Sequence, residues 1–155
     1  MVNVKKLNTN EEPISIKAHL TSVTNISLNY NGKLLATAST KGTIIRVYDT
    51  QNGTIVKELR RGVENAQIFS IGFTRDGNYL ICTSDKQTLH VFSMRNDESE
   101  KSIIRLKFKE QQFIAVFGEN DSINVVTSEG NYYKYICKQE RKYEMILKQN
   151  LQYIK

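Results

Sequence analysis

Short apolar runs separated by polar residues follow one another along nearly the whole chain, and helical periodicity is almost absent. The runs are rich in β-branched and aromatic residues and are bounded by Asn, Asp, Gly and Ser, which is typical of strands joined by turns. The predicted strands are Val2–Leu7, Ile14–Ala18, Val23–Tyr30, Leu34–Ala38, Thr43–Asp49, Thr54–Leu59, Gln67–Phe73, Tyr79–Thr83, Leu89–Met94, Ser102–Phe108, Gln112–Phe117, Ile123–Thr127, Tyr132–Ile136 and Tyr143–Leu147. The pattern therefore predicts an all-β fold.

The pattern repeats. Gly32 and Gly77 are 45 positions apart, Ser39 and Ser84 are also 45 apart, and Ser84 and Ser128 are 44 apart. A period of about 40–45 residues with four short strands in each unit is typical of β-propeller blades of the WD-repeat type. One blade cannot bury both of its faces, so blades stack around an axis.

The repeat divides the chain into a partial β-propeller of about three and a half blades. Residues 1–18 are predicted to be the outer strands of a preceding blade, and residues 19–62, 63–109 and 110–155 are each predicted to form one blade of four antiparallel strands. Propellers close with about four to eight blades. We therefore expect a fragment of a larger ring, and the exposed blade faces predict association with another copy.

Composition and charge restrict the classes of partner. The chain has 155 residues and a net charge of +6, which favours phospholipid headgroups, nucleic acid or acidic proteins, or serves only solubility. Cys82 and Cys137 form no metal or disulfide framework and are expected to be buried, reduced thiols of a cytosolic protein. No window approaches the roughly 18 apolar residues of a membrane span, and Met1–Lys6 lacks the apolar stretch of a signal peptide.

Two adjacent arginines mark the junction between two repeats, in the sequence Leu59-Arg60-Arg61-Gly62. Side chains in an extended segment alternate between opposite faces, so Arg60 and Arg61 can serve two different surfaces. The alternative is a charged turn with two solvated side chains.

Enzymatic activity is not expected. The two histidines lie in separate repeats without metal-ligand spacing, and the sequence contains no glycine-rich phosphate loop or nucleophile elbow. Neither a metal nor a cofactor is predicted.

Several motifs together resemble the PROPPIN family of phosphoinositide-binding β-propellers. The run Leu34–Asp49 followed by Glu58–Val63 carries the resemblance most strongly, because the hallmark of the family is F/L-R-R-G between the fifth and sixth of seven blades. Ala18-His19, Ser84–Phe92 and Val125–Lys134 also look like this family. The resemblance covers nearly the whole chain and would correspond to the end of blade four through blade seven.

The resemblance implies two headgroup pockets, one on each side of the arginine pair. The matching positions are His19, Ser39, Thr43 and Arg60 for the first pocket and Arg61, Ser84, Thr88 and His90 for the second. The implied ligands are phosphatidylinositol 3-phosphate and the 3,5-bisphosphate. Guanidinium, hydroxyl, imidazole and backbone N–H donors all suit phosphate oxygens.

These residues also have structural alternatives. The histidines can pack between blades, and the Ser and Thr pairs can bond their own turns. Arg46 can contact a headgroup, or it can pair with Asp49 or a neighbouring strand. Lys41 and Lys86 lie beside the expected pockets and can raise the local potential.

Two features depart from the family. The connection Ser93–Lys101 is short and acidic, whereas the family often carries a long, partly apolar loop there that enters the bilayer. Gln87 stands where a glycine is common, so its side chain can narrow the second pocket.

The predicted function is that of a membrane-recruited scaffold in autophagy, with phosphoinositide membranes and autophagy proteins as partners. The corresponding location is cytoplasmic and peripheral on autophagosomal, endosomal or vacuolar membranes. The alternative is a WD-type protein-interaction scaffold without lipid binding. No nucleic-acid partner is expected, because the tyrosines that lie among lysines have the spacing of blade strands.

Overall fold

The described part of the chain contains β-strands and no helix. The computed structural model describes residues 1–95, 99–120, 122–139 and 143–152. The strands are β1 (Val2–Val4), β2 (Ile14–Ile16), β3 (Val23–Leu28), β4 (Leu34–Ser39), β5 (Ile44–Asp49), β6 (Ile55–Arg60), β7 (Ile68–Phe73), β8 (Tyr79–Ser84), β9 (Thr88–Ser93), β10 (Ile104–Lys107), β11 (Phe113–Phe117), β12 (Ser122–Thr127), β13 (Asn131–Gln139) and β14 (Tyr143–Gln152). No helix long and apolar enough to span a membrane occurs among these residues.

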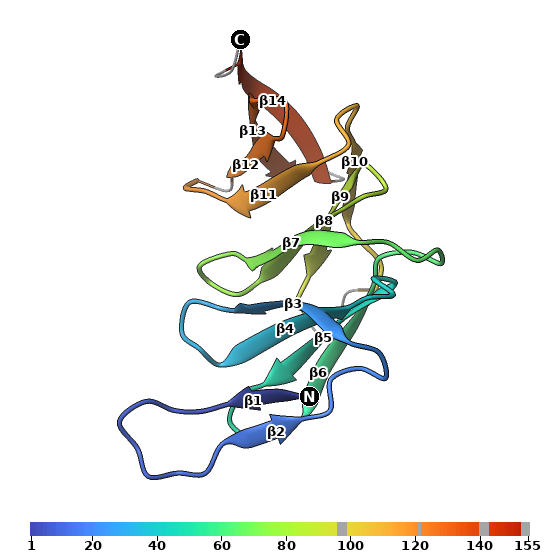
Figure 1. Cartoon of the computed structure of the whole chain (residues 1–155). Helices are drawn as coiled ribbons and strands as arrows, with labels where there is room; N and C mark the ends of the chain where they lie inside the picture. The colour runs from blue at the N-terminus through green and yellow to red at the C-terminus, as the bar shows by residue number, and fades with distance from the viewer. Residues whose placement is uncertain (96–98, 121, 140–142, 153–155) are drawn as a thin grey trace.

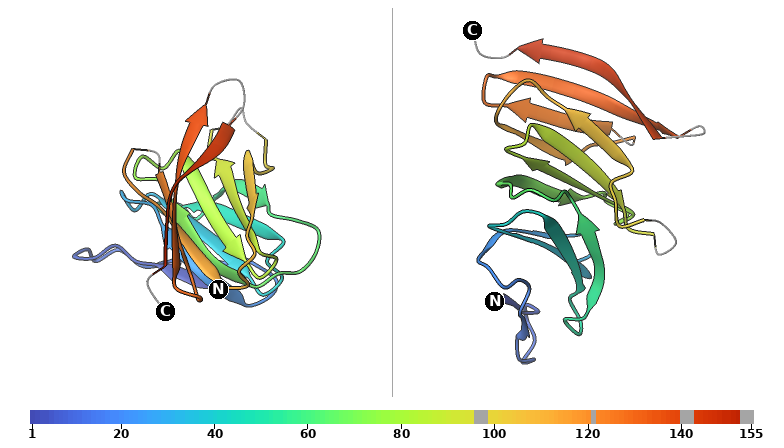
Figure 2. Two further views of the ribbon diagram at one scale, coloured as in Figure 1. Left: turned by 90° about the horizontal axis from the view of Figure 1, so that it is seen from above. Right: turned by 90° about the vertical axis from the view of Figure 1, so that its right-hand side faces the viewer.

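The described strands pair within separate sheets that follow the order of the chain. β3–β6, β7–β10 and β11–β14 are three antiparallel sheets of four strands each, and β1 pairs with β2 in a two-stranded sheet. Figure 1 shows these sheets following one another from the N-terminus to the C-terminus, and Figure 2 shows the same stack from two further sides. The all-β propeller architecture expected from the sequence is confirmed.

Apolar side chains from facing sheets form the core. Ala36, Ile45 and Leu59 of the first four-stranded sheet pack with Leu80 and Phe92 of the second. An equivalent cluster joins the second and third sheets. Full burial of a Leu, Ile or Phe side chain contributes roughly 1.5–3 kcal/mol, so sheet-on-sheet contact is the main source of stability.

The two-stranded sheet covers part of the first blade. Ile16 and Ala18 are buried against Leu35 and Tyr48, and the strands of the small sheet add Val2 and Val4. This contact brings the segment that follows β2, including His19, to the edge of the first four-stranded sheet.

The β13–β14 hairpin is longer than the sequence pattern predicted. β13 pairs with β12 only as far as Ile136, and beyond that point it pairs with β14 alone. Cys137 lies in this extension and is therefore only half-buried, which contradicts the burial expected for it, whereas Cys82 is fully buried. Both cysteines are free thiols.

Equivalent tight turns join the second and third strands of each blade. The N–H groups of Gly42, Gln87 and Gly130 donate to the carbonyls of Ser39, Ser84 and Thr127 at 2.9, 3.1 and 3.1 Å. All three residues at the turn tips have positive φ, between 57° and 79°. Glycine tolerates this conformation easily, whereas Gln87 occupies it as a non-glycine residue.

We expect Gly42→Ala to lower the free energy of unfolding much more than Gly32→Ala. Both glycines have positive φ, so either alanine is strained by roughly 1–2 kcal/mol. At Gly42 the added Cβ would also lie 1.9 Å from the Ala66 carbonyl oxygen, whereas at Gly32 nothing lies within 4 Å. Urea denaturation of the two variants measures the difference, which should be about 1–3 kcal/mol. Equal losses would contradict this packing.

Apolar side chains lie exposed on the two outermost faces of the stack. Ile26 and Leu28 on β3 are 61% and 56% exposed, and Ile114 and Val116 on β11 are 52% and 53% exposed. Ile71 and Phe73 occupy the same positions on β7 as Ile26 and Leu28 on β3. Because the first blade covers them, they pack into the core. Self-association through these exposed faces, expected from the sequence, stays a prediction.

Sedimentation velocity tests the predicted self-association. We expect the wild-type chain to sediment faster than a monomer, and Val116→Asp to restore the monomer because a carboxylate cannot be buried unpaired in an apolar contact. Leu7→Asp is the matched control, because Leu7 is 84% exposed in the loop between β1 and β2 and belongs to none of the four-stranded sheets. A monomeric wild-type chain would refute self-association.

Candidate functional site

Three of the four residues expected in the first pocket line one open cavity of about 190 Å³. They are His19 from the segment after β2, Ser39 from the end of β4 and Thr43 from the β4–β5 turn. The remaining lining residues are Leu20, Thr21, Lys41, Ile44 and Arg46. The cavity therefore combines hydroxyl groups, an imidazole and two cationic side chains, a donor set that suits a phosphate.

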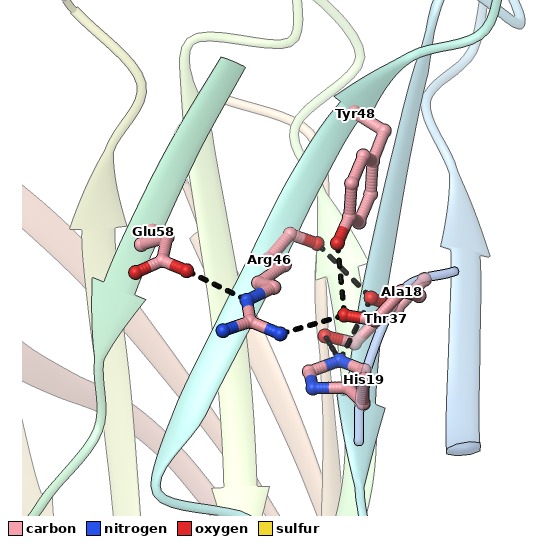
Figure 3. A network of polar contacts seen from close by, with 6 residues as sticks. All are labelled: Ala18, His19, Thr37, Arg46, Tyr48 and Glu58. Atoms are coloured by element: carbon pink, nitrogen blue, oxygen red, sulfur yellow. Dashed lines mark hydrogen bonds and ion pairs between the residues drawn. The ribbon is translucent and has the colours of Figure 1, made fainter. Parts of the chain in front are cut away.

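A polar network holds Arg46, one of the residues that line this cavity, and Figure 3 shows its contacts. Its Nε donates to Glu58 Oε1 at 2.6 Å, and its Nη1 donates to the Ala18 carbonyl at 2.8 Å. The Tyr48 hydroxyl donates to the same carbonyl at 2.9 Å. Of the alternatives left open for Arg46, the structure shows pairing with the neighbouring strand β6, and it also places Arg46 in the cavity wall.

His19 is held by the middle of β4. Its Nε2 lies 3.0 Å from Thr37 Oγ1 and 3.3 Å from the Thr37 carbonyl oxygen (Figure 3). Burial lowers the pKa of His19, the Thr37 backbone bond opposes this effect, and nearby Arg46 lowers the pKa further. The imidazole is therefore neutral at pH 7, and an anion beside it would favour its protonation.

Arg60 lies next to this cavity but is not part of its wall. It pairs in register with Ile44, a lining residue, and cross-strand partners share one face of a sheet. Its side chain is exposed, and its N–H donates to the Glu100 carbonyl at 2.9 Å. Arg60 can thus approach a ligand that projects from the cavity.

Arg61 is buried, with only 8% exposure. Its Nε donates to the Gly42 carbonyl at 2.7 Å, and its Nη2 donates to the Glu64 carbonyl. Its backbone N–H donates to the Thr43 carbonyl at 2.9 Å. Burial lowers the pKa of Arg61 from its usual value, while the charge of Asp85 acts in the opposite direction. The guanidinium therefore hydrogen-bonds the β4–β5 turn of the first repeat through the Gly42 carbonyl.

The residues expected in the second pocket lie close together in a buried network. Ser84 Oγ lies 3.3 Å from Thr88 Oγ1, which lies 3.2 Å from His90 Nε2. His90 Nδ1 lies 3.1 Å from Ser102 Oγ. Ser84, Thr88 and His90 are at most 3% exposed.

Sequence reasoning missed the groups that position the first cavity. Glu58 orients Arg46 and Thr37 orients His19, but neither residue belongs to a recognisable motif. Pairing β5 with β6 across their turn would have placed Glu58 opposite Arg46, because the two are register partners. The buried side-chain role of Arg61 has no sequence signal.

Comparison with known proteins identifies the family. A sequence model of the PROPPIN family matches residues 4–116, which is more than half of the chain. The chain belongs to the PROPPIN family.

Individual proteins of the same kind are similar to this PROPPIN chain. Autophagy-related protein 18e of Arabidopsis thaliana is 33% identical over 140 residues, which cover 76% of this chain and 37% of that protein. The solved Hsv2 of Kluyveromyces lactis superposes with a TM-score of 0.89 at 27% identity, over 97% of this chain and 55% of that one. The chain thus spans about half of the solved propeller.

A solved complex of the protein KlAtg21 with the coiled coil of AgAtg16 is also similar. It superposes with a TM-score of 0.77 at 26% identity, over 88% of this chain and 43% of the solved chain.

The buried histidine predicts a pH dependence of stability. Burial and the charges of Arg105 and Arg61 lower the pKa of His90 to about 4, well below the usual 6.5. Between these values the unfolded chain binds the proton more readily than the folded chain, so stability falls as the pH drops from 6.5 toward 4. The contribution is on the order of 2–3 kcal/mol.

We expect His90→Gln to lose less stability than the wild type between pH 7 and pH 5. Glutamine cannot be protonated in this range, while the carboxylates that also titrate are common to both proteins. Urea denaturation at the two pH values measures the difference. Parallel losses in both proteins would show that His90 is not the titrating group.

Proposed function

We propose that this chain binds the headgroup of phosphatidylinositol 3-phosphate or the 3,5-bisphosphate in the first cavity and acts as a membrane-recruited scaffold in autophagy. One observation carries the proposal: His19, Ser39 and Thr43, separated in sequence, line one open cavity together with Lys41 and Arg46. PROPPIN propellers are a binding and scaffold family rather than an enzyme family, which supports a recognition role.

The side chains that line the cavity suit a phosphate group of the headgroup. Ser39 and Thr43 hydroxyls offer neutral donors, and Lys41 is an exposed cation at the rim. Arg46 already bonds Glu58, so its charge is partly compensated. Lys41 and exposed Arg60 therefore supply most of the attraction for a phosphate that enters from the membrane.

The proposed location is cytoplasmic and peripheral on autophagosomal, endosomal or vacuolar membranes. Residues 96–98 of the Ser93–Lys101 connection lie outside the described residues. Its two ends are held by β6, because Lys57 Nζ donates to the Ser93 and Arg95 carbonyls and Arg60 N–H donates to the Glu100 carbonyl. With so short and acidic a connection, headgroup binding rather than bilayer insertion would provide the affinity.

Liposome flotation tests the lipid function. We expect Lys41→Ala, and Arg60→Thr combined with Arg61→Thr, to reduce recovery with vesicles that contain phosphatidylinositol 3-phosphate by roughly tenfold, the effect of losing a charge-assisted contact of about 1.4 kcal/mol. Lys33→Ala is the matched control, because Lys33 is exposed in the turn at the opposite end of β4. Undiminished flotation of the double-arginine variant would refute the proposed lipid binding.

A protein-only scaffold is the second candidate function. The similarity to a propeller solved with a coiled-coil partner favours it. A pulldown with the wild type and the double-arginine variant separates the candidates. Equal recovery of partners by a chain that does not float with vesicles would favour the protein-only function.

A further inference from the structure

We propose that Leu20, at the edge of the first cavity, enters the interface of the bilayer when the cavity holds a headgroup. The inference rests on the proposed function, because it assigns what the same site contacts beyond the headgroup. Headgroup binding remains the main source of affinity, and Leu20 adds a shallow apolar contact with the membrane around the bound lipid.

Leu20 combines strong exposure with a place in the cavity wall. Its side chain is 93% exposed, yet it lines the first cavity together with its neighbours His19 and Thr21. A single exposed leucine is ordinary on a protein surface. A lipid held by its headgroup, however, leaves its glycerol and acyl chains outside the cavity, so an apolar side chain at the cavity edge lies next to them.

Hydrogen bonds on both sides of Leu20 hold its backbone in place. Before it, the Ala18 carbonyl accepts a bond from Arg46 Nη1 at 2.8 Å. After it, the Ser22 carbonyl accepts a bond from the Thr40 N–H at 2.9 Å. The chain bends at Leu20 between these two anchors. Because the segment is already fixed, little conformational freedom is lost when the side chain meets a membrane.

The surroundings of Leu20 have the composition of a membrane-interface surface. Lys41 and Arg60 are exposed cations at or beside the cavity. Val63, which is 85% exposed, belongs to a segment that bonds the β4–β5 turn, where the Ala66 N–H donates to the Lys41 carbonyl at 3.0 Å. Cations mixed with exposed apolar side chains suit an anionic bilayer surface, where the charges meet headgroups and the apolar groups meet acyl chains.

A bilayer suits this edge better than a protein partner does. A stable protein interface buries roughly 1,600 Å² with an apolar centre, whereas the apolar side chains at this edge, Leu20 and Val63, flank cations. A membrane contact needs no such area, because it adds to a headgroup that is already bound to the same surface.

Comparison of a membrane with the free headgroup tests the proposal. We expect Leu20→Ser to weaken binding to phosphatidylcholine vesicles that contain phosphatidylinositol 3-phosphate by at least about fivefold, because the apolar contact is lost. Binding of soluble inositol 1,3-bisphosphate, the same headgroup without acyl chains, should change by less than about twofold, as for an ordinary surface substitution. Vesicle cosedimentation and isothermal titration measure the two affinities.

Leu7→Ser is the matched control, because Leu7 is 84% exposed in the β1–β2 loop and is not among the residues that line the first cavity. It should leave both affinities unchanged. Unchanged vesicle binding by Leu20→Ser would overturn the membrane contact, and an equal loss for vesicles and free headgroup would show that Leu20 shapes the cavity instead. A wild-type chain that binds neither ligand would refute the proposed function itself, so the two failures are distinguishable.

Tryptophan fluorescence locates the contact. The chain contains no tryptophan, so Leu20→Trp carries a single reporter. With vesicles that contain phosphatidylinositol 3-phosphate, its emission should shift to shorter wavelength and be quenched by lipids with brominated acyl chains, because the indole lies at the membrane interface. Leu7→Trp should show neither change. Unquenched emission from vesicle-bound Leu20→Trp, or equal quenching at the two positions, would contradict an apolar contact at the edge of the cavity.

Discussion

Face-to-face burial of apolar sheets is the interaction on which the rest of this structure depends. Each blade has apolar side chains on both faces, such as Leu35 and Ala36 on successive positions of β4, and each face must be covered. Because successive sheets stack on one another in the same way, the turn between the second and third strands lies at the same edge of each sheet. The repeated backbone geometry of these turns is a consequence of this packing.

Backbone carbonyls at those edges are satisfied by long cationic side chains. Arg46 bonds the Ala18 carbonyl and so joins the segment after β2 to the first four-stranded sheet, which brings His19 to the cavity. Arg61 bonds the Gly42 carbonyl and holds the turn on the other side of the same cavity. In both cases an arginine that the sequence suggested as a candidate ligand donates to a backbone carbonyl, a role that suits the several donors of a guanidinium.

The sequence predicted the fold and the residues that line the first cavity better than the hydrogen bonds and ion pairs that hold those residues in place. Apolar alternation and the 45-residue spacing of Gly32 and Gly77 were sufficient to predict an all-β fold of repeated four-stranded sheets, since the alternation follows directly from sheet geometry. The convergence of His19 with Ser39 followed from family resemblance. The burial of Arg61 and the Glu58–Arg46 pair could not be predicted, because they depend on which carbonyl or carboxylate lies within reach across neighbouring segments.

The three equivalent turns show how one backbone geometry supports different electrostatics. The first turn presents Lys41 beside an open cavity. In the second turn, the Gln87 side chain donates to the Lys109 carbonyl. The third faces buried Glu110, which accepts bonds from Asn131 and Tyr133. Burial alone would raise the pKa of Glu110, but these bonds and those from the backbone outweigh it and lower the pKa, so the carboxylate is charged at pH 7. A carboxylate beside the third turn repels an anion, whereas Lys41 in the first turn attracts one. The same turn geometry therefore occurs with different charges around it, and the side chains near each turn determine whether its surroundings favour an anion.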